Sequence, residues 1–313
     1  MLIIIFGPVP SRRLGRSLGV NNIPPKYCSY SCVYCQLGLT YNLTIERRQF
    51  YAPEEILKEA KEKIIRLKEI GEKVDFITFV SDGEPTLDIN LGEEIRMLKS
   101  FSIPVAVITN SSLLFLESVR QDLYEADLVS LKVDTLSELT FKKINRPNHF
   151  LNLDSIFDGI VEFSKVFKGK LITETMLVKG INDSGEELKD IASFIAKINP
   201  SKSYISIPTR PPAESWAKPP EEEVLNMAYQ IFREKVKNVN MLITPEEGEF
   251  TIADDLQEDL LSIVSVHPIR EEEIHKLLDE KRSDFSLVSN LIEEGKIKKV
   301  KYNNKIFYIR KLS

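Results

Sequence analysis

The chain has 313 residues, of which 42% are hydrophobic and 28% are charged, a composition typical of a folded protein with a hydrophobic core. Its formal net charge of -5 argues against a protein that coats nucleic acid over its whole surface, although a local basic patch remains compatible with it. No apolar run has the length of a transmembrane helix, so we expect no membrane partner, and cysteines in reduced form predict a cytoplasmic protein.

The N-terminal segment combines a short apolar run with a cluster of arginines. MLIIIF predicts an opening strand, and residues 16–22, RSLGVNN, predict another strand. Between them, in the stretch GPVPSRRLG, lie Arg12 and Arg13, and Arg16 follows directly. These arginines are interpreted either as a solvated charge run or as side chains that hold a phosphate or carboxylate of the substrate.

All three cysteines of the chain, Cys28, Cys32 and Cys35, lie in one short stretch, KYCSYSCVYCQLG. Their odd number and tight spacing argue against disulfides, and the flanking sequence does not resemble a helix interior with inert cysteines. A structural zinc site needs four ligands, and His149, His267 and His275 are all distant in sequence. An iron–sulfur cluster is the remaining interpretation, because three thiolates leave one iron of a four-iron cluster open for a small molecule.

The spacing C-x3-C-x2-C, with Tyr34 directly before the last cysteine, resembles the radical S-adenosylmethionine (SAM) superfamily. The resemblance implies that the cysteines hold one [4Fe-4S] cluster, whose open iron binds SAM, and that Tyr34 packs beside the adenine. It further implies an oxidoreductase-type enzyme that cleaves SAM reductively to a 5′-deoxyadenosyl radical, which abstracts hydrogen from a substrate. An electron donor of flavodoxin or ferredoxin type is the implied partner.

Short β-branched runs alternate with amphipathic helical patterns along the chain. Such repeats predict a parallel α/β sheet, whose chemistry lies at the carboxyl ends of the strands. The number of repeats, together with the resemblance, predicts a partial (β/α)6 TIM-like barrel over residues 1–245, with the cysteine loop after strand 16–22. The later predicted strands are 75–81, 104–110, 127–134, 170–178 and 202–208, and the clearest helices are 53–71 and 184–200.

A second motif, Gly83, Glu84 and Pro85, follows the strand at 75–81. One interpretation is a strand-to-helix loop rich in turn formers. The resemblance instead implies a Gly-Glu-Pro stretch that contacts the amino group of SAM, for which the Glu84 carboxylate is a suitable acceptor. We favour the second interpretation because order and spacing agree with the cysteine motif.

Charged and polar residues also lie in the later strands. Asn110 ends one strand, Lys132 and Asp134 lie two residues apart and therefore on one face of another, and Glu174 lies in a third. The resemblance implies that Asn110, Lys132 and Glu174 hold the ribose and the methionine carboxylate of SAM. An internal Lys–Glu pair across the barrel is the open alternative.

A proline-rich loop, residues 206–220, follows the last predicted strand and contains Arg210 and the only tryptophan, Trp216. Its position at the carboxyl end of a strand suits a lid or a substrate wall that includes both residues. A rigid exit from the barrel is the alternative interpretation.

Residues 253–313 predict a separate small domain of three helices and a hairpin. The helical patterns are 254–266, 270–280 and 284–295, and Asn303 and Asn304 separate two alternating runs. This order resembles a winged helix, which implies either phosphate contacts to RNA or DNA or a protein-docking role; His267 and His275 are interpreted as packing residues. The hairpin carries Lys296, Lys298, Lys299, Lys301, Lys305, Arg310 and Lys311.

The N-terminal block, GPVPSRRLG into CSYSCVYCQLG, resembles a branch of radical SAM proteins related to the tRNA wyosine-synthesising enzymes. It departs from those enzymes in the spacing of cysteines and flanks, and in the tail. Three hypotheses follow: a radical SAM enzyme acting on tRNA or another RNA, one acting on a protein or peptide, and an iron–sulfur redox sensor that binds DNA through its tail. The Gly83–Pro85 motif argues against the sensor, which needs no ammonium acceptor.

Overall fold

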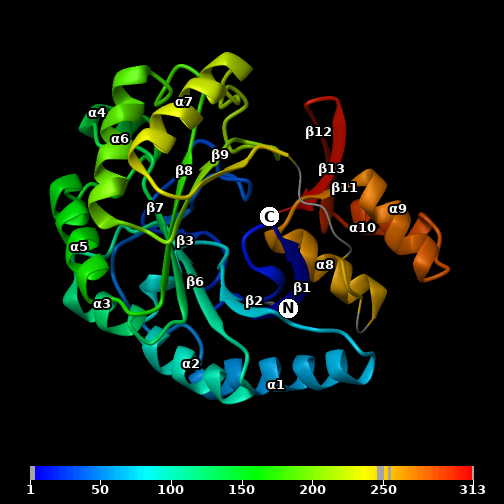
Figure 1. Ribbon diagram of the computed structural model, residues 1–313. Helices are drawn as coiled ribbons and strands as arrows, with labels where there is room; N and C mark the ends of the chain where they lie inside the picture. The colour runs from blue at the N-terminus through cyan, green and yellow to red at the C-terminus, as the bar shows by residue number, and fades with distance from the viewer. Residues whose placement is uncertain (1–3, 245–249, 253–254, 312–313) are drawn as a thin grey trace.

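The computed structural model describes residues 4–244, 250–252 and 255–311. Its centre is a sheet of eight strands in the order β1-β2-β5-β6-β7-β8-β9-β10, with helices on its outer side (Figure 1). Strands β2 to β10 run parallel to their neighbours, and β1 pairs antiparallel with β2. The strands are β1 (Ile5–Ser11), β2 (Gly15–Val20), β5 (Phe76–Phe79), β6 (Val105–Thr109), β7 (Leu128–Lys132), β8 (Lys170–Met176), β9 (Lys202–Ser206) and β10 (Val239–Leu242).

The predicted α/β architecture is confirmed: each of the six strands predicted in the repeating part lies in the parallel sheet. Strand β10 was not predicted, and residues 1–3 of the expected opening strand lie outside the described residues. Within the described part of the chain, no ladder joins β1 to β10, so the sheet curves as an open barrel.

The helices that cover the sheet follow the usual start and stop signals. Helix α1 begins at Pro53, has acidic residues in its first turn, and turns its buried stripe of Ile56, Ala60, Ile64 and Leu67 to the sheet. Helix α6 begins after Ser184, whose side chain accepts a hydrogen bond from Glu187 N. The covering helices are α1 (Pro53–Glu69), α2 (Leu91–Leu98), α3 (Glu117–Leu123), α4 (Glu138–Ile144), α5 (Leu153–Val166), α6 (Gly185–Ile198) and α7 (Glu222–Lys235), with the short 3-10 turns η1 (Pro85–Leu87) and η2 (Lys99–Phe101).

The inner face of the sheet changes character along the strands. Nearer the amino ends it is apolar, where Leu128, Ile172 and Tyr204 pack together. Two or four residues further along β7, β8 and β9, the same face carries Lys132, Glu174 and Ser206. The carboxyl ends of the strands therefore surround a polar interior.

Residues after the sheet form α8 (Leu256–Val266), β11 (Ile269–Arg270), α9 (Glu271–Glu280), α10 (Ser286–Glu293), β12 (Ile297–Tyr302) and β13 (Lys305–Arg310). The three strands make an antiparallel sheet in the order β11-β13-β12. Asn303 and Asn304 turn the hairpin with φ of 46° and 58°. The expected three helices and hairpin are present, with residue 254 outside the described part; their assignment as a winged-helix domain, and the division at 245 and 253, remain predictions.

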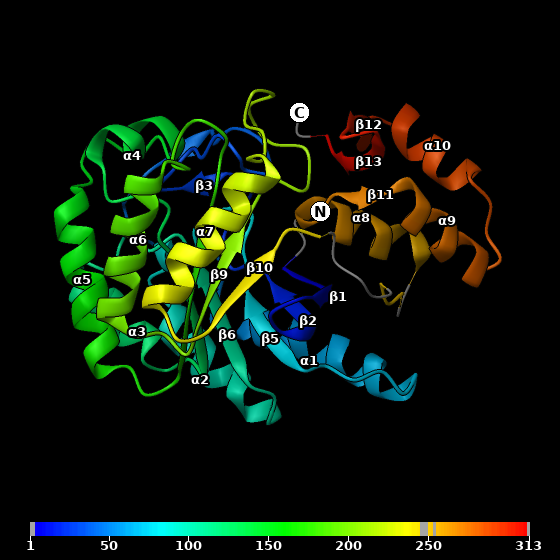
Figure 2. The same cartoon turned by 45° about the horizontal axis from the view of Figure 1, so that its top comes forward.

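This tail (residues 250–252 and 255–311) packs against the N-terminal edge of the barrel (Figure 2). Phe6 and Val9 of β1 belong to the same buried cluster as Leu260, Ile263 and other apolar residues of the tail. A mostly buried ion pair joins Lys63 Nζ to Asp259 Oδ1 at 2.6 Å. The cluster and the ion pair seat the tail beside the mouth of the barrel.

Candidate functional site

All three cysteines line one cavity of about 310 Å³ at the carboxyl ends of the strands. The loop that carries them leaves β2 and is held by a short parallel ladder between β3 (Tyr27–Cys28) and β4 (Asn42–Leu43). Within it, Cys35 N donates to Cys32 O at 3.0 Å, and Gly38 N donates to Cys35 O at 3.1 Å. The local turns thus direct three separated sulfurs into one space, which we call the cysteine cavity.

The surroundings of the sulfurs suit anionic thiolate ligands only when a positive group is bound. Burial raises the pKa of the Cys32 thiol to about 12 and also raises that of Cys28, so both are neutral in the chain alone. Asn110 Nδ2 lies 3.5 Å from Cys28 Sγ, and Asn145 Nδ2 lies 3.5 Å from Cys32 Sγ. Amide donors of this kind stabilise cluster-bound sulfur, and a bound metal group displaces the thiol protons.

The geometry is not that of a single-ion site. Across the described residues, no three side chains of histidine, cysteine, aspartate or glutamate gather closely enough to hold one metal ion. His149 packs against Phe150, and His275 stacks on Phe285. The three thiols in one cavity, with amide donors at two of them, fit a larger group that separates its ligands.

The loop after β5 approaches the cysteine loop very closely. Glu84 N donates to Tyr27 O at 3.0 Å, and a Cβ at position 83 would lie only 1.7 Å from that same oxygen. Only glycine fits here. Pro85 then begins η1, and its carbonyl lies 3.3 Å from Asn22 Nδ2.

The Glu84 side chain is buried and accepts hydrogen bonds from several neighbouring donors. Oε1 accepts from Thr86 N at 3.1 Å and from the hydroxyls of Thr86 and Thr109 at 2.6 Å each. Oε2 accepts from Asn110 N at 2.7 Å. Burial raises the pKa of Glu84, while these hydrogen bonds act to lower it. Glu84 therefore ties the loop after β5 to the end of β6, and Oε2, with one donor, keeps acceptor capacity.

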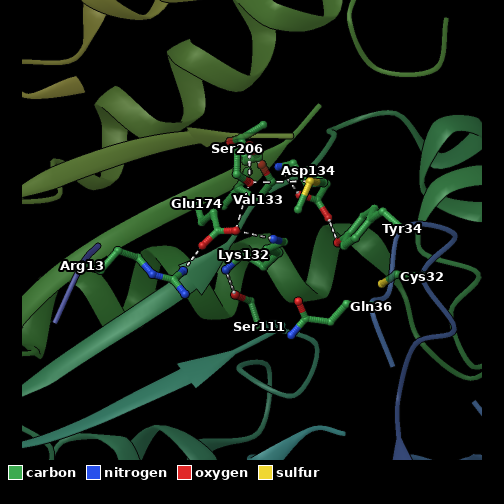
Figure 3. A network of polar contacts seen from close by, with 12 residues as sticks. Arg13, Cys32, Tyr34, Gln36, Ser111, Lys132, Val133, Asp134, Glu174 and Ser206 are labelled. Atoms are coloured by element: carbon green, nitrogen blue, oxygen red, sulfur yellow. Dashed lines mark hydrogen bonds and ion pairs between the residues drawn. The ribbon is translucent and has the colours of Figure 1, made fainter. Parts of the chain in front are cut away.

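Lys132 and Glu174 form the ion pair that was left open as an alternative, and the pair lines the cysteine cavity (Figure 3). Lys132 Nζ lies 2.9 Å from Glu174 Oε1, because β7 and β8 place the two residues directly opposite each other. Glu174 also pairs with Arg13 and accepts from Ser206 Oγ at 3.0 Å. The Glu174 carboxylate is therefore held by Lys132 of β7, Ser206 of β9 and Arg13 in the turn after β1.

A second polar group continues this network toward the cysteines (Figure 3). Tyr34 donates its hydroxyl to Asp134 Oδ2, and Lys132 Nζ lies 5.1 Å from the centre of the Tyr34 ring. Asn145 Nδ2 donates to the same Asp134 oxygen at 2.9 Å, and Met176 N donates to Oδ1 at 2.9 Å. The aromatic residue before the last cysteine is thus fixed against the barrel wall.

The structure brings most of the predicted site residues together. Arg16, Pro85 and Trp216 do not line the cysteine cavity. Arg16 pairs with Glu72 and donates its main-chain N–H to Asp75 Oδ2 at 2.7 Å, Pro85 begins η1, and Trp216 is 43% exposed in its loop. Arg210 bridges to Gln36 Oε1 at 2.7 Å and to His267, so the proline-rich loop and the tail meet at the cavity. The predicted residues that line it are Arg12, Arg13, Cys28, Cys32, Tyr34, Cys35, Gly83, Glu84, Asn110, Lys132, Glu174 and Arg210.

Several cavity residues were missed. Lys26 stands two positions before Cys28 and donates Nζ to Gly38 O at 2.8 Å, and Asp82 directly precedes the glycine motif. Both were adjacent to recognised motifs, which was a usable signal. Ser206 had no such signal, since only the register of β8 and β9 places it beside Glu174. His267, interpreted as a packing residue, packs on Phe250 and also meets Arg210.

Comparisons with known proteins agree with this geometry. A family model described as the Radical SAM superfamily matches residues 22–195. A UPF0026 protein of Methanocaldococcus jannaschii is 49% identical over 99% of this chain and 97% of its own length. A UPF0026 protein of Helicobacter pylori strain 26695 is 32% identical over 97% of each chain.

The fold also has solved counterparts. A radical SAM methyltransferase from Sphaerobacter thermophilus superposes with a TM-score of 0.54 at 15% identity, covering 73% of this chain and 66% of that one. Among the described residues, no helix is long and apolar enough to cross a membrane. Radical SAM superfamily members bind a [4Fe-4S] cluster and SAM. The matched residues include the cysteine loop and strands β5 to β8, and the chain therefore belongs to the radical SAM superfamily of enzymes.

Proposed function

We propose that Cys28, Cys32 and Cys35 hold one [4Fe-4S] cluster and that the cysteine cavity binds SAM, with RNA as the substrate. The observation that carries the proposal is the convergence of the three thiols, Gly83 and Glu84, and the Lys132–Glu174 pair on one cavity. When bound, the cluster supplies the electron that cleaves SAM to a 5′-deoxyadenosyl radical. An external donor of flavodoxin or ferredoxin type delivers that electron, because the chain has no cysteines beyond these three.

The residues around Glu84 orient the methionine end of SAM. The hydrogen bonds of the Glu84 carboxylate fix the loop that contains Gly83. Oε2 accepts one hydrogen bond from the chain and therefore has capacity to accept a second from the SAM ammonium. Asn110, whose amide contacts both Cys28 and Ser29, positions the neighbouring strand end.

Lys132 and Arg13 supply the positive charge for the SAM carboxylate. Lys132 has three N–H donors, and its hydrogen bond to Glu174 uses one of them. Burial lowers the pKa of Lys132, and its pairing with Glu174 keeps a cation in place there. In this arrangement Lys132 belongs both to the internal Lys–Glu pair and to the SAM site, so these two interpretations of Lys132 and Glu174 are compatible.

RNA is the proposed substrate because basic residues dominate the mouth of the cavity and the N-terminal block resembles the wyosine branch. The tail is proposed to be a winged-helix module. A protein or peptide substrate has no comparable feature in its favour, and the family match argues against a DNA-binding redox sensor.

The proposal is tested by anaerobic reconstitution with iron and sulfide, then reaction with dithionite and SAM. We expect 5′-deoxyadenosine from the wild type and none from Cys32→Ala. Ser193→Ala, on the exposed side of α6, is the matched control and retains activity. A reduced cluster that neither binds SAM nor yields 5′-deoxyadenosine contradicts the proposal.

A further inference from the structure

Two further cavities adjoin the cysteine cavity, and the tail forms a wall of each. The hairpin cavity, of about 330 Å³, lies between the cysteine loop, the proline-rich loop and the β12–β13 hairpin. The proline-loop cavity, of about 230 Å³, lies between residues 207–210 and the tail. Lys26, Gln36, Leu37 and Asp82 line both the cysteine cavity and the hairpin cavity, so these two are contiguous.

The tail is fixed against this mouth by specific contacts. The buried Tyr302 hydroxyl donates to Pro208 O at 3.0 Å, and Arg310 lies 3.5 Å from Asp82 Oδ2. Lys218 Nζ lies 5.4 Å from the centre of the Tyr302 ring. A molecule bound at the mouth therefore meets the tail and the barrel together.

The linings of the three cavities concentrate positive charge in a chain whose net charge is -5. Acidic residues are the minority among the charged residues there. The cations are Arg12, Arg13, Lys26, Lys132, Arg210, Arg270, Lys298, Lys305 and Arg310, and the carboxylates are Asp82, Glu84, Glu174 and Glu273. A local surplus of this kind selects an anionic substrate.

The hairpin cavity also presents an exposed aromatic side chain beside its cations. Tyr41 is 68% exposed and lines the cavity together with Lys298, an exposed residue of β12. Aromatic rings next to basic side chains are the usual platform for single-stranded nucleic acid, since the ring stacks on a base while the cation meets a phosphate. The volume of the cavity suits a ligand of nucleotide size.

We propose that the hairpin cavity is a binding subsite for one nucleotide of a single-stranded RNA segment, with Tyr41 under the base and Lys298 at the phosphate. This rests on the proposed function, since RNA is the substrate there. A nucleotide in this subsite lies next to the cysteine cavity through Lys26 and Gln36. The tail is then the outer wall of the substrate cleft.

The register of the hairpin provides a matched control. Lys298 and Val300 face the hairpin cavity, and alternation along β12 turns Lys299 and Lys301 to the opposite face, where Lys299 pairs with Glu271. Lys298 and Lys301 are both exposed on the same strand. Lys298→Glu and Lys301→Glu therefore make the same charge change on opposite faces.

The test is fluorescence anisotropy with a labelled single-stranded RNA of about ten nucleotides and with bulk tRNA, at several salt concentrations, using full-length protein. We expect Tyr41→Ala and Lys298→Glu each to weaken RNA binding by roughly ten-fold or more. Lys298→Ala lowers the salt dependence, the slope of log Kd on log salt, by about one. Lys301→Glu retains the wild-type affinity at this subsite. Thermal melting checks that each variant folds.

Equal weakening by Lys298→Glu and Lys301→Glu overturns the subsite, because RNA then binds the outer face of the hairpin. An affinity for AMP equal to that for the oligonucleotide overturns RNA as the source of the nucleotide. If the wild-type protein binds neither the labelled oligonucleotide nor tRNA, the inference is overturned. Formation of 5′-deoxyadenosine without RNA is measured separately, so failure of the radical chemistry is distinguished from failure of the subsite.

Discussion

The cysteine cavity and the hairpin cavity share four lining residues but are built by different means. In the cysteine cavity, strand register fixes the polar groups: Lys132 opposes Glu174 across two adjacent strands, and Ser206 reaches the same carboxylate from a third. In the hairpin cavity, loops and the tail meet, Tyr41 is exposed, and buried Asp82 meets the tail through Arg310, 3.5 Å from its Oδ2.

This difference indicates that the two cavities at the mouth of the barrel have different roles. Groups held by mutual hydrogen bonds are rigid and suit a cofactor that must be oriented accurately. Exposed side chains without fixed partners suit a larger ligand, because they can adjust to it when it binds. Substitutions in the first region should therefore affect stability and SAM chemistry, and those in the second should affect substrate binding.

The largest effect is expected from Gly83→Ala. A Cβ at this position would lie 1.7 Å from Tyr27 O, so the cysteine loop must move away from the loop after β5. We expect the free energy of unfolding to fall by about 3 kcal/mol and the iron content after reconstitution to fall sharply. Denaturant unfolding and iron analysis measure the two effects.

Gly185→Ala is the matched control, because a Cβ there meets only Met227 Sδ at 3.8 Å. Wild-type stability and iron content in Gly83→Ala would show that the two loops are not held in close contact.

Glu174→Ala is expected to have the next largest effect. It leaves Lys132 and Arg13 mostly buried without their shared carboxylate, and because the pair is partly exposed we expect a loss of about 2–3 kcal/mol, less than for a fully buried pair. Thermal denaturation measures the loss, and the KM for SAM should rise because the cations are no longer held in place.

Glu138→Ala is the matched control. It is also a Glu-to-Ala change, but it removes an exposed ion pair with Lys142, so we expect almost no change in stability. Equal stability of the Glu174 and Glu138 variants would mean that the cavity pair is as loosely held as a surface pair.

A pH-dependent effect is expected at Asp82, where the two cavities meet. Burial raises the pKa of Asp82 to about 6, although Arg310 acts to lower it. The unfolded chain releases this proton near pH 4, so between about pH 4 and pH 6 the folded state binds more protons. The contribution of Asp82 to stability therefore falls as pH rises through this window, by about 3 kcal/mol at most.

Asp82→Asn removes this contribution, so urea unfolding should show a variant more stable than wild type at pH 7.5 and nearly equal to it at pH 4. Arg310→Gln should show the reverse above pH 6, because it leaves the Asp82 charge without its ion pair. An Asp82→Asn variant with the wild-type pH dependence would contradict the assignment.

The sequence predicted the parts of this molecule that depend on local patterns. Apolar runs identified the six repeating strands, and Pro53 and Ser184 marked helix starts. The three cysteines and Gly83 were recognised because their spacing is itself the signal, and all of them line the cavity. Such features can be recognised from the sequence without knowledge of the tertiary structure.

What could not be predicted depends on contacts between distant segments. Glu84 lines the cavity as expected, but its hydrogen bonds from Thr109 and Asn110, which lie 25 and 26 residues later, could not be predicted from the sequence. Arg16 belonged to the same cluster as Arg13, yet it lies at the start of β2 and pairs with Glu72 rather than entering the cavity. The docking of the tail depends on Phe6, which inserts where Gly19 has no side chain.

The smallest expected effect is at the contact between the tail and the proline-rich loop. Tyr302→Phe removes the buried hydrogen bond to Pro208 O while keeping the ring that lies under Lys218. The lost bond is worth about 1 kcal/mol, so local opening should become about five-fold more frequent. Amide hydrogen exchange at residues 207–210 measures it.

Tyr308→Phe is the matched control, since it removes a hydrogen bond of 2.7 Å to Glu271 that lies wholly within the tail. Exchange at residues 207–210 should rise in Tyr302→Phe and stay unchanged in Tyr308→Phe. If both variants leave it unchanged, the apolar cluster around Phe6 and Val9 seats the tail without help from this hydrogen bond. The Tyr302 hydroxyl would then add nothing to the docking of the tail, which the apolar cluster and the contact between Arg210 and His267 maintain.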